Sequence, residues 1–188
     1  MEKNRLEAFS DGVLAIVITI MVLELKQPAG DGPGDLLTLG PTLLAYAISY
    51  LFIAIYWVNH HLIFRLADRI NRRILWCNIA WLFTLSFIPF TTAWVGSWPR
   101  SWVPLCLYFA DMALACYTFH QLYYLVLQER GEPFRLSLRG AMSVIVYTGA
   151  ALLGGFGPPA AFAAVAAVSL WWIAPLKKKE ERGEGSET

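Results

Sequence analysis

Six stretches of about twenty mostly apolar residues limit the possible folds of this 188-residue chain more than any other feature. A helix of that length, at about 1.5 Å per residue, crosses the roughly 30 Å hydrocarbon core of a bilayer. Hydrophobic residues make up 57% of the sequence and charged residues 15%, an unusual balance for a soluble domain. We therefore predict an all-α integral membrane protein whose six transmembrane helices are 5–25, 41–64, 74–94, 102–127, 138–156 and 159–176.

These helices form a single predicted domain, residues 1–176, followed by a polar tail, 177–188, that we expect to be disordered. The sequence GGFGPP, residues 154–159, separates the last two helices and predicts a tight turn between them. Glu7 and Asp11 stand where a signal peptide would carry positive charge, so we expect the first helix to remain in the mature protein.

The distribution of basic residues predicts the orientation of the chain. With six helices, thirteen of the fifteen Lys and Arg residues fall on one side of the membrane, and only Lys26 and Arg100 fall on the other. Basic loops remain in the cytoplasm, so both termini are predicted to be cytoplasmic. Trp94, Trp98 and Trp102 cluster at the opposite boundary, as an interfacial aromatic belt would. A net charge of +1 gives no reason to expect a nucleic-acid partner.

The first predicted helix carries polar groups at both ends. Its uninterrupted apolar run, residues 12–23, covers only about 18 Å, so Glu7, Asp11 and Glu24 must lie near membrane depth. Ionised carboxylates facing lipid are costly, which favours a helix that faces protein or water. Ile16, Thr19, Ile20 and Leu23 share one face of this helix. Ordinary packing or lipid contact would explain that apolar face equally well.

Further polar residues are predicted at the same cytoplasmic depth as Arg5, Ser10 and Asp11. Asn59, His60 and His61 close the second helix, and Asn78 opens the third. Buried polar groups in a bilayer need partners, so we predict a hydrogen-bonded cluster that joins the first helix to the second and third. The pairing remains open, and either histidine would also suit a lipid headgroup. The adjacent histidines lack the spacing of a metal site, and we predict none.

The pattern R-x-x-x-F-S-D, formed by Arg5, Phe9, Ser10 and Asp11, opens the first apolar run. It resembles the signature of the endosomal and lysosomal potassium channel family known as transmembrane protein 175. The resemblance implies a prokaryotic homologue with a single six-helix repeat, which assembles as a homotetramer with the first helices lining a central pore. It places the constriction at Ile16, with further layers at Ile20 and Leu23 and a hydroxyl at Thr19. It also makes His60, His61 and Asn78 matches for the inner polar network.

The implied function is a leak-type, potassium-selective channel in the plasma membrane of a prokaryote. The family uses no P-loop, and the sequence contains no T-V-G-Y-G filter. A ring of isoleucines is a hydrophobic constriction that gates by dewetting, and it favours potassium because potassium holds its water less tightly than sodium. The expected partners are potassium ions, the lipid bilayer and further copies of the chain, with no cofactor.

Other functions remain as alternatives. A proton-coupled or other secondary transporter would use His60, His61, His120 and Asp111 of the second and fourth helices as a relay. A membrane-embedded enzyme is disfavoured, because the sequence contains neither H-E-x-x-H nor G-x-S-x-G. A scaffold of apolar helices without transport activity is the third alternative.

Overall fold

The computed structural model describes residues 2–67 and 69–174 of the chain, and the predicted tail 177–188 lies outside them. The long helices are α1 (Lys3–Leu23), α3 (Gly40–Leu66) and α6 (Trp102–Arg130). The others are α2 (Pro33–Thr38), α4 (Arg72–Leu85), α5 (Ile88–Ser97), α7 (Leu138–Leu153), the 3-10 helix η1 (Gly154–Phe156) and α8 (Pro158–Ile173). No strand occurs among the described residues, so the prediction of an all-α chain is confirmed.

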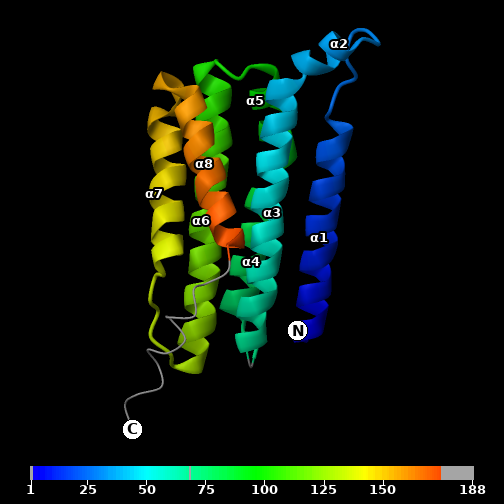
Figure 1. The fold of residues 1–188 in the computed structure, drawn as a ribbon. Helices are drawn as coiled ribbons and strands as arrows, with labels where there is room; N and C mark the ends of the chain where they lie inside the picture. The colour runs from blue at the N-terminus through cyan, green and yellow to red at the C-terminus, as the bar shows by residue number, and fades with distance from the viewer. Residues whose placement is uncertain (1, 68, 175–188) are drawn as a thin grey trace.

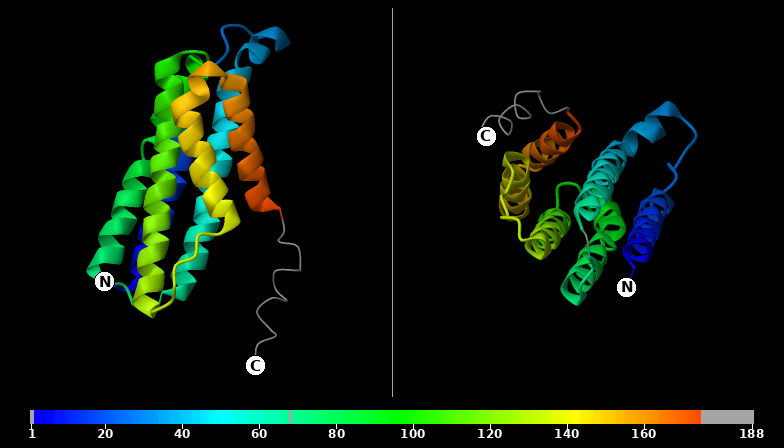
Figure 2. Two further views of the ribbon diagram at one scale, coloured as in Figure 1. Left: turned by 90° about the vertical axis from the view of Figure 1, so that its left-hand side faces the viewer. Right: turned by 90° about the horizontal axis from the view of Figure 1, so that it is seen from below.

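The helices form an antiparallel bundle in which α1 lies at one edge (Figure 1). Helix α1 packs against α3, α4 and α5, while α6 contacts α4 on one side and α7 on the other. The hairpin of α7 and α8 forms the opposite edge, as the view from below in Figure 2 shows. This order leaves much of one side of α1 exposed in the described part of the subunit.

Within residues 2–67 and 69–174, five helical segments are long and apolar enough to cross a membrane: α1, α3, α4 with α5, α6, and α7 with η1. Helix α8 is apolar but has only 16 residues, which corresponds to about 24 Å. Its sequence starts with two prolines after Gly157, which fix the start of the helix immediately after the turn predicted from GGFGPP.

The span predicted over residues 74–94 consists of two helices, α4 and α5, with a break at Ser86 and Phe87. Pro89 explains the break, because it has no N–H to donate to the carbonyl of Leu85. The N–H of Phe87 instead donates to the carbonyl of Thr84, a tighter turn than that of an α-helix. The short helix α2 was not predicted. Pro33 begins it, and the N–H of Gly32 donates to the Asp35 carboxylate at 3.1 Å.

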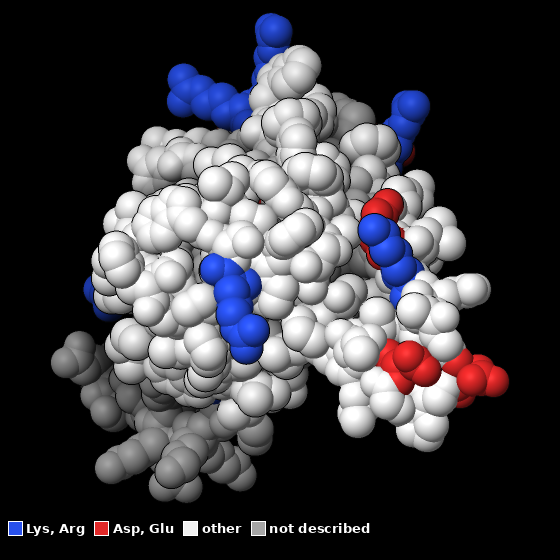
Figure 3. All heavy atoms as spheres, turned by 90° about the horizontal axis from the view of Figure 1, so that it is seen from above, with Lys and Arg blue, Asp and Glu red and all other residues white. Residues whose placement is uncertain are grey.

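The two ends of the bundle differ in charge. Arg65, Arg72, Arg130 and Arg135 lie at the ends of helices or in loops beside the N-terminus, whereas Lys26 and Arg100 belong to the loops at the other end. Figure 3 views that second end, whose central surface is mostly uncharged; red acidic side chains gather at one side, and most of the blue Lys and Arg side chains project at the rim.

Candidate functional site

Helix α1 has one buried face and one bare face. Its buried side chains recur every three or four residues, as one stripe of a helix does, and they are Leu6, Ser10, Leu14, Val17 and Met21. This stripe packs against α3, α4 and α5. The only polar member is Ser10, which is completely buried. The stripe therefore fixes which side of α1 points away from its own subunit.

The four residues predicted to line a pore all lie on the bare face. Ile16 is 58% exposed, Ile20 41% and Leu23 81%, and Thr19 is also exposed. The Thr19 hydroxyl donates to the carbonyl of Ile16 at 2.9 Å, which leaves the lone pairs of its oxygen free to accept. Among the described residues, Ile16 and Ile20 border a groove beside Ser86, Pro89 and Phe90, and Leu23 is largely exposed. The role of this face therefore depends on what surrounds α1 in the membrane.

A buried chain of hydrogen bonds joins α1 to α4 and α3. The amide of Asn78 donates to the Ser10 hydroxyl at 2.9 Å, and the Asn78 carbonyl oxygen is 2.9 Å from Nε2 of His60. The Ser10 hydroxyl in turn donates to the carbonyl of Leu6 at 2.9 Å. Because this arrangement commits the Asn78 oxygen as an acceptor, it assigns the proton of the neutral His60 ring to Nε2.

Aromatic side chains hold the His60 ring in place. The ring stacks on Phe64 with a centroid separation of 4.4 Å and on Trp81 at 5.0 Å. Between the two predicted histidines, it is His60 that the structure places in the network, because His60 is 1% exposed whereas His61 points to the surface. Sequence alone did not distinguish them, since the choice depends on the rotation of α3 about its axis.

The remaining residues of the R-x-x-x-F-S-D pattern lie outside this network. Arg5 and Phe9 are exposed. The Asp11 carboxylate accepts a hydrogen bond from the indole N–H of Trp57 at 2.9 Å, which ties the exposed side of α1 to α3. Trp57 was not among the predicted residues, because an aromatic residue near the end of an apolar helix gives no specific signal in the sequence.

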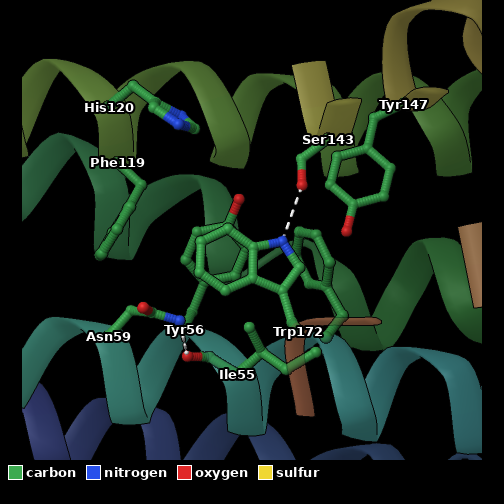
Figure 4. A pocket seen from close by; sticks show the side chains of 9 residues that line it. Ile55, Tyr56, Asn59, Phe119, His120, Ser143, Tyr147 and Trp172 are labelled. Atoms are coloured by element: carbon green, nitrogen blue, oxygen red, sulfur yellow. Dashed lines mark hydrogen bonds between the residues drawn. The ribbon is translucent and has the colours of Figure 1, made fainter. Parts of the chain in front are cut away.

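The residues of the transporter alternative are not brought together. His120 lines a small pocket between α3, α6, α7 and α8, with Asn59, Tyr147 and Trp172 (Figure 4). The pocket has a volume of about 30 Å³, enough for roughly two water molecules. Asp111 instead accepts from the Thr91 hydroxyl at 3.1 Å, and His60 belongs to the α1 network. In the described part of the chain, no group of three acidic, histidine or cysteine side chains is placed to hold a metal.

Comparison with known proteins finds similarity to one family of ion channels. The family model described as "Endosomal/lysosomal potassium channel TMEM175" matches residues 5–89, which include α1, α3 and α4. A potassium channel of Chryseobacterium sp. (strain P1-3) is 37% identical over 187 residues, covering 96% of this chain and 97% of the relative. A potassium channel of Streptomyces collinus is 43% identical over 103 residues, covering 53% of this chain and 50% of that protein.

A solved structure is similar over most of the chain. The crystal structure of a lysosomal potassium-selective channel TMEM175 homologue from Chamaesiphon minutus matches with a TM-score of 0.81 and 28% sequence identity. The match covers 92% of this chain and 96% of the other. The similarity in fold therefore extends well beyond the residues that the family model matches.

Proposed function

Because the chain belongs to the TMEM175 family of endosomal/lysosomal potassium channels, we propose that it is a potassium-selective leak channel in which α1 lines the pore of a homotetramer. The bare apolar face of α1 supports this assignment most directly. It carries Ile16, Thr19, Ile20 and Leu23, and the opposite face of the same helix is buried in the subunit.

The buried hydrogen-bonded network fixes the rotation of α1 and therefore the direction in which this face points. Ser10, Asn78 and His60 hydrogen-bond one another where α1, α4 and α3 meet. In a bilayer these groups have no alternative partners, so rotating α1 about its axis would leave several of them unsatisfied. The network therefore holds Ile16 away from the subunit core. Four copies around an axis would place a ring of isoleucines at the narrowest point.

Such a ring selects among ions by the cost of removing their water. Branched aliphatic side chains offer no oxygen to replace the hydration shell, so the more weakly hydrated potassium ion crosses more readily than sodium. The exposed Thr19 hydroxyl lies about one helical turn after Ile16 along α1. Its oxygen would coordinate the ion once it has passed the isoleucine ring. The positive end of the α1 dipole lies at the inner mouth and repels cations, and the acidic side chains of Glu7 and Asp11 offset it.

The proposal includes the topology and the location. The chain would cross the membrane six times, with α8 as a short sixth span, so that both termini lie in the cytoplasm. The channel would then lie in the plasma membrane of a prokaryotic cell. The arginine-rich end of the bundle beside the N-terminus supports this orientation.

The central test is ion flux through purified protein in liposomes. We expect a potassium gradient to drive flux that sodium supports less well, with caesium as a further comparator and protein-free liposomes as the control. Planar-bilayer recordings should show unitary current steps. Flux that saturates and is coupled to a second ion, without unitary steps, would instead indicate a transporter.

A further inference from the structure

An apolar slot lies between α3 and α8 at the end of the bundle opposite the N-terminus. Its volume is about 650 Å³, and its walls are formed by Leu44 and Ile48 of α3 and by Phe162, Ala163 and Ala166 of α8. The rest of its lining is formed by Gly40 and Pro41 at the start of α3, the prolines that begin α8, and Pro99, Arg100 and Gly155. The slot is on a different part of the subunit from the bare face of α1.

The sequence explains why this space is not filled by the protein. Leu44 and Ile48 are one turn apart on α3, and the facing stripe of α8 is largely alanine. Small side chains usually allow helices to approach closely, but here the bulk of Phe162 turns inward against Tyr108 and Phe109. The alanines therefore border open space. From Gly40 to Ile48 the slot follows α3 for about 12 Å into the membrane.

Arg100 gives the slot a cationic rim. It belongs to the short connection between α5 and α6, and its side chain is exposed. Trp98 and Trp102, which are 61% and 47% exposed, flank it. Exposed tryptophans of this kind sit at the level of lipid headgroups. Among the described residues the one salt bridge joins Arg130 to Glu132, so Arg100 has no acidic partner there.

We propose that this slot binds one phospholipid of the surrounding leaflet, with an acyl chain between α3 and α8 and the phosphate on Arg100. An acyl chain gains little by leaving a bilayer that is equally apolar. Retention therefore depends on the charge-assisted hydrogen bonds between the guanidinium and the phosphate, for which the planar arginine group is well suited. A free phosphate ion shares that chemistry but would leave the apolar walls unused.

Native mass spectrometry of the whole protein in mild detergent tests the proposal. The probes are phosphatidylglycerol and a diacylglycerol with the same acyl chains. We expect phosphatidylglycerol to be retained preferentially, and Arg100→Gln to weaken its binding roughly tenfold, the effect of losing hydrogen bonds to a charged group. Lys26→Gln removes the other basic residue of this end and should have no effect.

A second pair of variants tests the apolar walls. Ala163 and Ala164 are neighbours and both are exposed, but only Ala163 lines the slot. Ala163→Trp should fill the slot and reduce phospholipid retention, whereas Ala164→Trp should leave it unchanged. Far-UV circular dichroism and size-exclusion chromatography of each variant establish that it is folded.

Three outcomes would overturn the proposal. Equal retention of diacylglycerol and phosphatidylglycerol would show that Arg100 does not bind the phosphate. Displacement of the lipid by millimolar inorganic phosphate alone would indicate a simple anion site. If Ala163→Trp dissociates the oligomer instead of releasing lipid, the slot is a subunit interface. None of these readouts depends on potassium flux, so the channel assignment stands or fails separately.

Discussion

The amide group of Asn78 joins three helices, because it donates to Ser10 of α1 and accepts from His60 of α3. All three side chains are at most 1% exposed. We expect Asn78→Leu to lower the free energy of unfolding by about 1–3 kcal/mol, since it leaves the His60 N–H buried without an acceptor. Thermal denaturation in detergent measures the change in Tm. His61→Ala, at the exposed neighbour, is the control and should barely shift it.

The Asp11 carboxylate needs only one of its oxygens for its contact with Trp57. Asp11→Asn keeps an acceptor at that position, whereas Asp11→Ala removes it. We therefore expect Asp11→Ala to impair tetramer assembly or conduction. Asp11→Asn should retain most of the assembly and conduction of the wild type. Size-exclusion chromatography and potassium flux are the measurements. A fully active, normally assembled Asp11→Ala protein would show that this contact does not anchor α1.

The Ile16 side chain is the proposed narrowest point of the pore. An asparagine there offers an amide oxygen to a passing ion and admits water, so Ile16→Asn should raise conductance and lower selectivity for potassium over sodium. Reversal potentials in bilayer recordings under mixed ionic conditions give the permeability ratio. Val22→Asn makes the same polar change on a different flank of the exposed surface and serves as the control. An unchanged ratio in Ile16→Asn would argue against the isoleucine ring.

At the scale of one helix, the two faces of α1 predict opposite effects for the same substitution at adjacent positions. Val17 is 4% exposed and packs in the subunit core, whereas Ile16 is 58% exposed. Val17→Asn buries an unpaired amide and should destabilise the fold by about 1–3 kcal/mol. Ile16→Asn should leave Tm close to that of the wild type. Equal destabilisation by both substitutions would mean that α1 is rotated about its axis so that Ile16 is also buried in the subunit.

The helices could be predicted from the sequence far better than their interruptions. Apolar length alone located α1, α3 and α6, because each long helix must satisfy its backbone groups internally in a membrane. The division between α4 and α5 depends on Pro89, and a single proline inside an apolar run does not by itself predict a break because membrane helices tolerate it. Helix α2 was missed for another reason: a single capped turn contains too few residues to show a periodic pattern.

At the scale of the whole subunit, the polar network illustrates what a sequence cannot specify. The depth of Ser10, His60 and Asn78 followed from their positions along predicted helices. Their pairing did not, because it depends on how α3 and α4 are rotated against α1. The same rotation decides which of the two adjacent histidines, His60 or His61, faces Asn78. Hydrophobic periodicity is a weak guide to rotation in helices that are apolar on all sides.

The position of α1 at the pore axis of the assembly is tested by access to Leu23, which is 81% exposed at the end of α1. In a background lacking Cys77, Cys106 and Cys116, Leu23→Cys should react with a cationic thiol reagent, and the current should fall because a bulky charge then occupies the pore. Leu138 on α7 is 70% exposed at the opposite edge of the subunit, so Leu138→Cys should react without block. Block from Leu138 and none from Leu23 would place the axis beside α7 and contradict a pore lined by α1.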